Sequence, residues 1–279
     1  KRQVWDRYVY LAGRPPAGLK IEQAVHRDPQ DSEARLALAE TYLLSGRYAD
    51  ALEQAEEVLG LYPDAANALL IAGISNVRMG QSEAALAPLR SFVAQRQDGP
   101  LARSDSVLEA AYYHLGESYL KLNRPTEAIP VLEAALLINP TDADALFQLG
   151  LAYNASGQPE IGVQQFIEAV RFVPDFAEAY NGMAASYSAL GWYDHEAYAQ
   201  GMEAFSLKDC RAARPLLKRA TEALPDFGPA FLGIGLTNEC LDELQTALPA
   251  IRRTLELDPD DFAAHQALGR IQAALNSQD

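Results

Sequence analysis

Few residues of this 279-residue chain have the type and spacing that a reactive centre needs. The four histidines, His26, His114, His195 and His265, lie far apart along the sequence, so they are not expected to share a metal ion. Neither a CxxC nor an HExxH motif supplies metal ligands at a fixed spacing. Glycine-rich phosphate-binding loops of the GxxxxGK[ST] or GxGxxG type are also missing from the sequence. We therefore expect no metal site and no cofactor.

Three short motifs have a chemical interpretation and a simpler structural one. Ser118 and Lys121 form an SxxK spacing, in which a lysine can activate a serine nucleophile, but the same residues fit an ordinary helix of a repeat. The pair His195-Glu196 fits the solvated start of a helix. Asn154-Ala155-Ser156 is a formal glycosylation sequence, which matters only in a secreted eukaryotic protein. We predict no catalytic residue and interpret the chain as a non-enzyme.

Cys210 and Cys240 are the only cysteines in the sequence. Two cysteines in a chain of this length do not make a disulfide framework. Two free, mostly buried thiols are the preferred interpretation and one bridge is the alternative. Neither interpretation fixes the compartment.

The charge balance argues against nucleic acid as a partner. The net charge is −15 with a pI near 4.7, and basic residues are scattered among acidic ones, so the chain should repel phosphate backbones. No run of 18 apolar residues is present to span a membrane. Lys1-Arg2 ahead of Trp5, Tyr8 and Tyr10 could flank a lost membrane anchor, although a first helix with its own packing aromatics is the preferred interpretation.

The elements that would position these residues follow a period of 34. Prolines mark the period, and small residues and turn glycines repeat it. The spaced positions are Pro29 and Pro63, Pro140 and Pro174, Pro225 and Pro259, Gly46 and Gly80, and Gly157 and Gly191. Several independent series at one spacing indicate a tandem structural repeat.

Each repeat has the pattern of two helices. In the repeat that spans 32–63, Ser32 caps an apolar-periodic segment that ends at Gly46, where glycine tolerates a left-handed conformation. A second amphipathic segment runs from Tyr48 to Leu61, and Pro63 stops it. A pair of this kind cannot bury its apolar face alone, so neighbouring pairs must stack.

These residues carry a family resemblance that covers nearly the whole chain. The repeat 109–140 has Tyr112, Leu115-Gly116, Tyr119, Ala128, Ala135 and Pro140, and it resembles the tetratricopeptide repeat. Asn76 and Asn238 replace the usual tyrosine, and Gly162 replaces the usual alanine. The resemblance implies an all-α, right-handed superhelical solenoid of antiparallel helix pairs.

The period is broken twice. Around residues 95–104, extra residues predict a surface loop or a lengthened helix end. Near Asp194, the series of equally spaced residues is short by half a repeat. Either one helix is truly missing, or a segment is absent from the sequence. The predicted organisation is a partial repeat at 1–31, repeats over 32–194, further repeats over 195–260, and a capping helix and tail at 261–279.

The resemblance also implies a binding surface, because the first helix of each repeat lines the concave groove in this family. The residues expected there are Glu40, Leu43, Leu70, Ile74, Val77, Arg78, Tyr113, Glu117, Lys121, Phe147, Leu151, Asn154, Asn181 and Ser188. Each of them could equally pack against a neighbouring helix. Arg78 and Lys121 could hold an acidic group of a ligand, and the apolar members could hold its hydrophobic side chains.

The expected function is that of a scaffold or adaptor that binds a peptide or protein segment in this groove. The alternative is a structural subunit of a large assembly, which could be associated with a membrane, and a third hypothesis is an accessory domain of an enzyme. The sequence leaves the partner and the compartment open, and both the cytoplasm and the periplasm of a bacterium fit.

Overall fold

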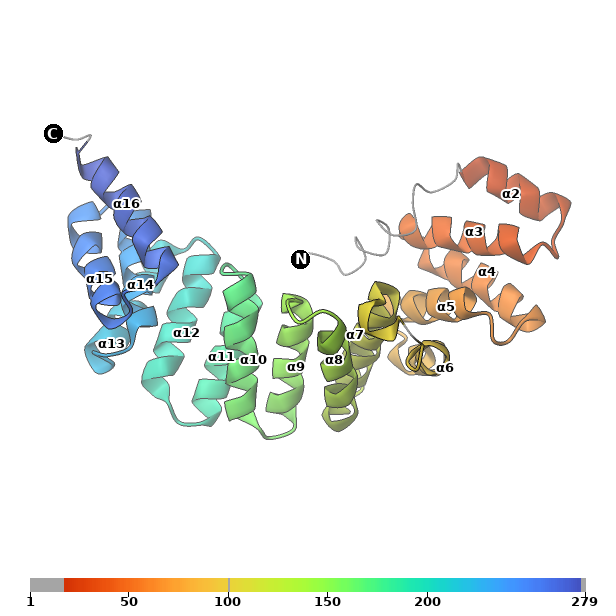
Figure 1. The fold of residues 1–279 in the computed structure, drawn as a ribbon, viewed down its shortest axis with the longest axis horizontal. Helices are drawn as coiled ribbons and strands as arrows, with labels where there is room; N and C mark the ends of the chain where they lie inside the picture. Colours follow the sequence, from red (N-terminus) through yellow and green to blue (C-terminus); the bar gives the residue numbers. More distant parts are fainter. Residues whose placement is uncertain (1–17, 100, 277–279) are drawn as a thin grey trace. The chain divides into compact units, whose positions relative to one another are not determined.

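The computed structural model describes residues 18–99 and 101–276, and every regular element in these ranges is a helix (Figure 1). The helices follow one another in sequence, and each packs mainly against its neighbours along the chain within its own unit. Two compact units result, residues 1–156 and residues 157–279. The predicted boundary at residue 194 marks an interruption of the 34-residue period and not a boundary between compact units. It stays a prediction. Lys1, Arg2, Trp5, Tyr8 and Tyr10 lie outside the described ranges, so neither the preferred first helix nor the alternative anchor flank is tested.

The first unit holds eight α-helices and one short 3₁₀ helix in its described part. They are α2 (Gly18–Arg27), α3 (Ser32–Leu44), α4 (Tyr48–Leu61), α5 (Ala66–Arg78), α6 (Ser82–Arg96), η1 (Ala102–Ser104), α7 (Ser106–Lys121), α8 (Pro125–Ile138) and α9 (Ala143–Ala155). The first helices of the repeats, α3, α5, α7 and α9, contact one another in that order and form one layer. The core runs along this layer, and α5 is buried from Ala68 to Val77.

The second unit holds seven helices in its described part. They are α10 (Pro159–Phe172), α11 (Ala177–Ala189), α12 (Tyr193–Ser206), α13 (Cys210–Ala223), α14 (Gly228–Cys240), α15 (Leu244–Leu257) and α16 (Phe262–Asn276). Helix α16 packs on α15 and α14 and covers Ile251, which is fully buried. Its predicted role as a capping helix stays a prediction.

Local sequence chemistry sets the helix boundaries. Gly46 and Gly191 adopt positive φ values of 77° and 72° between the two helices of a pair, where a side chain would cost conformational energy. Acidic side chains cap several first helices, and Asp31 accepts a hydrogen bond from the Ala34 amide at 3.0 Å. The N-cap of α3 is thus Asp31, and the assignment of this cap to Ser32 was wrong by one position.

The stretch 95–104 holds the end of α6 and the short helix η1, and its role as an insertion between repeats stays a prediction. Helix α6 extends to Arg96, and the chain then turns through η1 before α7 begins. The Arg96 Nε donates to Asp105 Oδ2 at 2.8 Å, while Asp105 Oδ1 caps α7 by accepting from the Val107 and Leu108 amides. The Asp105 carboxylate therefore holds the end of α6 and the start of α7, which flank the extra residues.

Helix α12 takes the place of two helices. It runs without a break through Asp194 and His195, packs on α11 as a second helix does, and packs on α13 as a first helix does. It also contacts α14, in the way that α3 contacts α5. Whether the irregularity near Asp194 reflects a lost helix stays a prediction.

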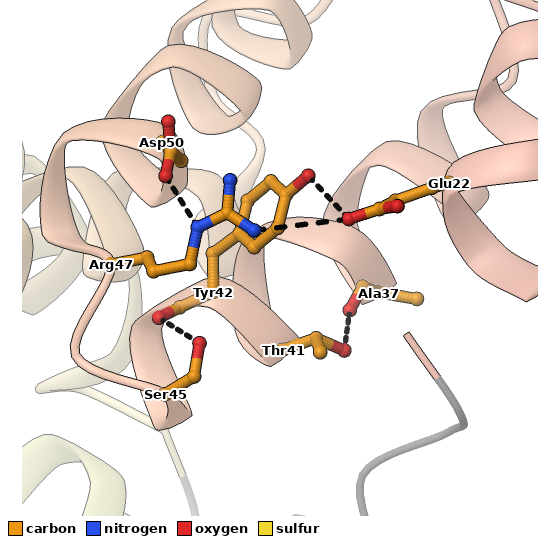
Figure 2. A network of polar contacts seen from close by, with 7 residues as sticks. All are labelled: Glu22, Ala37, Thr41, Tyr42, Ser45, Arg47 and Asp50. Atoms are coloured by element: carbon orange, nitrogen blue, oxygen red, sulfur yellow. Dashed lines mark hydrogen bonds and ion pairs between the residues drawn. The ribbon is translucent and has the colours of Figure 1, made fainter. Parts of the chain in front are cut away.

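Helix α2, the first helix in the described ranges, is joined to the next pair by a polar network (Figure 2). The Tyr42 hydroxyl donates to Glu22 Oε1 at 2.9 Å, and the Arg47 guanidinium lies 4.0 Å from the centre of the Tyr42 ring. Arg47 also pairs with Asp50 at 2.6 Å. Tyr42 is the tyrosine of the repeat pattern, so a repeat-defining residue anchors the partial repeat that precedes it.

Candidate functional surface

The predicted groove residues of the first unit divide into a buried set and an accessible set. Leu43, Leu70, Ile74 and Val77 are at most 2% exposed and belong to the hydrophobic core. They pack helices together, which is the other role that the sequence allowed for them. Seven more are half-buried and Lys121 is exposed; these eight are Glu40, Arg78, Tyr113, Glu117, Lys121, Phe147, Leu151 and Asn154. The accessible candidates therefore lie mostly on α7 and α9, with Arg78 on α5 and Glu40 on α3.

The two remaining candidates, Asn181 and Ser188, are exposed on α11 of the second unit. The Asn181 Nδ2 donates to Glu203 Oε1 of α12 at 3.0 Å, so its amide is used within that unit.

A charged network runs along α7. Glu117 lies one turn from His114 and one turn from Lys121, so both partners reach the same carboxylate. The His114 Nδ1 lies 3.2 Å from Glu117 Oε2, and the Lys121 Nζ donates to Glu117 Oε1 at 2.8 Å. Burial opposes ionisation of Glu117, but its hydrogen bonds with His114 and Lys121 outweigh burial and lower its pKa to about 2. Glu117 is therefore a fixed anion at neutral pH.

Burial controls the aromatic and imidazole groups beside this carboxylate. His114 is 1% exposed, and burial lowers its pKa, so the imidazole is neutral at pH 7 despite its contact with Glu117. The Tyr113 ring meets the His114 ring edge-on at a centroid distance of 5.3 Å. Burial, followed by the charge of Glu117, raises the pKa of Tyr113, whose hydroxyl is hydrogen-bonded to Gln148 of α9. The network thereby connects α7 with α9.

Arg78 of α5 is a half-buried cation near this network. Within the part of the chain that the structure describes, its guanidinium makes no ion pair or hydrogen bond. Its charge helps to lower the pKa of His114, which places it in the field of the α7 network. A shallow hollow lined by Gln81, Glu83 and Lys121 among others adjoins the last turn of α7. Lys121 is shared between this hollow and Glu117.

The SxxK spacing has no catalytic geometry. The Ser118 hydroxyl donates to the His114 carbonyl oxygen of the preceding turn at 2.8 Å and is fully buried. The Lys121 Nζ bonds to Glu117 instead of Ser118. Among the described residues no group of three or more His, Cys, Asp or Glu side chains could hold a metal ion. The described helices include none that is long and apolar enough to cross a membrane.

The preferred interpretation of the cysteines as two free thiols was wrong, and the alternative of one bridge is confirmed. Cys210 and Cys240 form a disulfide, because α13 and α14 bring their Cα atoms within 6.4 Å. His195 lies in the first turn of α12, as predicted, but it is half-buried, and the rings of Tyr187, Trp192 and Phe227 lie at centroid distances of 5.2–5.6 Å from its ring. Burial lowers the pKa of His195.

Sequence reasoning also missed groups that share the first-helix register. Phe205 on α12 and Leu232 and Leu236 on α14 are half-buried. Phe205 follows Gly201 as Asn154 follows Gly150. Leu232 and Leu236 flank Gly235 as Phe147 and Leu151 flank Gly150. The small residues that recur every 34 positions were the signal that could have identified them. Gln148 gave no sequence signal, because its role depends on the distance between α7 and α9.

Comparison with known proteins identifies the repeat. Family profiles described as "Tetratricopeptide repeat" and "TPR repeat" match residues 20–74 and 116–157. Protein FlbA of Caulobacter vibrioides is 34% identical over 169 residues, which are 61% of this chain and 25% of FlbA. The peroxisomal targeting signal receptor of Candida albicans is 24% identical over 65% of this chain and 36% of the receptor. The chain thus spans about a quarter to a third of these two relatives.

Solved structures show the same fold. The crystal structure of YrrB, described as "a TPR protein with an unusual peptide-binding site", covers 77% of this chain and 97% of its own, with a TM-score of 0.52 and 21% identity. MamA covers 61% of this chain and 95% of its own, with a TM-score of 0.54 and 23% identity. At this level of identity the likeness concerns the fold alone.

Proposed function

Because this chain is a tetratricopeptide-repeat protein, we propose that it is an interaction scaffold that binds a peptide or protein segment on α5, α7 and α9. Repeats of this family generally serve as protein-interaction scaffolds. The proposal locates the site on the first helices of the first unit, where accessible charged and apolar side chains adjoin.

The observation that carries this proposal is the state of the charges on these helices. Glu117 is neutralised by Lys121, whereas Arg78, half-buried on α5, has no acidic partner among the described residues. A cation that is partly removed from water and unpaired is better stabilised when a ligand supplies a carboxylate. Arg78 therefore favours a ligand with an acidic group.

The rest of the ligand chemistry follows from α9. Phe147 and Leu151 are half-buried, so each retains apolar surface that a ligand could cover. A segment with one acidic group and adjacent apolar side chains would match Arg78 together with these two residues. YrrB, a protein of this fold, is described as having a peptide-binding site, which adds support to a peptide ligand.

The experiment compares two charge reversals in the first unit. A displayed library of random dodecapeptides is selected on the parent chain, and the enriched peptides are titrated against R78E and R90E. Arg90 is exposed on the second helix α6, so R90E makes the same charge change away from the proposed surface. We expect enriched peptides to carry an acidic residue beside apolar ones.

For those peptides R78E should weaken binding about 10-fold to 100-fold, because a hydrogen bond to a charged group contributes about 1.5–3 kcal/mol. R90E should bind as the parent does. Equal binding by both variants, with circular dichroism showing both folded, would remove Arg78 from the site. Failure to enrich any peptide would instead favour a structural subunit held by larger surfaces.

A further inference from the structure

The disulfide closes the open end of one helix pair. Cys210 is the first residue of α13 and Cys240 is the last residue of α14, and the two are 30 positions apart. A turn at Pro225 joins these helices at their other end. The bond therefore fastens the end of the pair that the chain itself leaves unconnected.

We propose that this bond is a redox-controlled clamp, opened by a dithiol reductant that attacks the sulfur of Cys240 and releases the thiolate of Cys210. The clamp sets how firmly the end of α14 is held against α13 and α16. This inference concerns the second unit and does not depend on the peptide site proposed for the first.

Accessibility decides which sulfur is attacked. Cys240 is exposed at the end of α14, whereas Cys210 is 4% exposed. An incoming thiolate must approach the sulfur that it attacks along the line of the S–S bond. An approach to Cys240 comes from solvent, whereas an approach to Cys210 would have to pass through packed side chains.

The helix ends favour the same direction. A thiolate at a helix N-terminus is stabilised by the partial positive charge there, and one at a C-terminus is not. Cys210 occupies the N-terminus of α13, with Lys208, Arg211 and Arg214 close by in sequence. Asp209 opposes this effect, but its carboxylate is engaged in capping the Ala212 amide. Cys210 is therefore the better leaving group.

The exchange consumes one dithiol for each bond opened. The first thiolate of the reductant forms a bond to the Cys240 sulfur, and the electron pair of the S–S bond leaves on Cys210, which then takes a proton from water. The second thiolate attacks the mixed disulfide and releases Cys240. The reductant ends as a disulfide and the two cysteines end as thiols.

Residues next to Cys240 show what the clamp controls. Glu239 accepts two hydrogen bonds of 2.8 Å from Arg270 of α16, and Glu243 holds Arg214 of α13 through both of its carboxylate oxygens. These ion pairs are partly exposed, and each such pair is weak by itself. The disulfide between Cys210 and Cys240 keeps Glu239 close to Arg270 and Glu243 close to Arg214.

Two measurements test the clamp on the intact chain. In the first, the oxidised protein is treated with a thioredoxin-type reductant whose resolving cysteine is replaced by serine, so that the mixed disulfide persists. Peptide mass spectrometry should find the reductant on Cys240. Attachment mainly to Cys210, or two alkylatable thiols after equilibration with oxidised glutathione, would overturn the proposal.

In the second, amide hydrogen exchange is followed with and without dithiothreitol. Closing a loop of this size stabilises a fold through the entropy of the open chain, so reduction should speed exchange at the ends of α13 and α14 and in α16, by up to about 100-fold. Helices α3 to α8, which contain no cysteine, are the internal control. The variant C210S/C240S should exchange as the reduced parent does and ignore dithiothreitol. Unchanged exchange in the reduced parent would show that the bond clamps nothing.

Discussion

At the scale of single residues, the close approach of two helices depends on glycine, which has no side chain. Gly235 of α14 lies against Ile251 of α15, and a Cβ atom at Gly235 would come within 2.5 Å of Ile251 Cδ1 and 3.4 Å of its backbone nitrogen. Gly269 holds the same position in α16, where no further helix follows in the described chain and a Cβ atom would meet nothing within 4 Å. One residue type thus has a packing role in one repeat and none in the next.

This pair predicts opposite effects of one substitution. G235A should lower the free energy of unfolding by about 1–3 kcal/mol, because the added methyl overpacks the α14–α15 contact. G269A should raise it by about 0.5–1 kcal/mol, because alanine favours a helix over glycine and the space is open. Urea unfolding followed by circular dichroism measures both. A similar loss in both variants would mean that the crossing does not require glycine.

His114 predicts how stability depends on pH. Burial lowers its pKa below the usual 6.5, so the folded state keeps the ring neutral while the unfolded state takes up a proton as the pH falls. Stability from this group is complete above pH 6.5 and is lost below it, by at most about 1.4 kcal/mol per pH unit. His195 contributes in the same window and direction.

The measurement is the free energy of unfolding at pH 7.5 and at pH 5.5. The parent should lose stability between these values, and H114Q should lose less, because of these two imidazoles only His195 remains. Parallel pH profiles of the parent and H114Q would contradict the assignment of the slope to His114.

At the scale of elements, α2 shows how a partial repeat is retained. It has one helical neighbour, α3, among the described elements with substantial contact, and the hydrogen bond from Tyr42 to Glu22 joins the two (Figure 2). The neighbouring Arg47 lies over the ring and faces the same carboxylate at 3.8 Å. Among the described elements these contacts are what joins α2 to the rest of the unit, so we expect its local stability to depend on them.

Y42F tests this dependence because it removes the hydroxyl and keeps the ring. The loss of one hydrogen bond should cost about 1 kcal/mol and speed amide exchange in α2 roughly 5-fold. Y119F is the matched control, because Tyr119 holds the same position in its repeat and its hydroxyl has no hydrogen bond within the described ranges. Equal exchange of α2 in Y42F and the parent would show that apolar packing alone retains the helix.

At the scale of the whole molecule, stability is built from neighbour to neighbour within each unit. Within each unit the contacts of the described helices join elements that are adjacent in sequence or one helix apart, and α15 and α16 share a buried cluster around Ile251. Such a chain can accommodate an interruption of the 34-residue period, because α12 packs on both α11 and α13. The same logic lets the extra residues around 95–104 leave the repeats on either side intact.

The sequence by itself determined the repeat, the helices and the turns. These follow from local rules that require no knowledge of tertiary contacts. The rules are the left-handed conformation at Gly46, the break at Pro63 and the apolar period of each helix. The family and the all-helical fold could be predicted for the same reason.

Only the tertiary structure decided which side chains meet. Leu70 and Ile74 have the same sequence character as Phe147 and Leu151, yet the first two are buried and the others keep accessible surface. The pairing of Cys210 with Cys240 was left open, and the rings around His195 were not predicted, for the same reason. Burial and pairing depend on distances between helices, and a periodic pattern defines the face of a helix but not what approaches it.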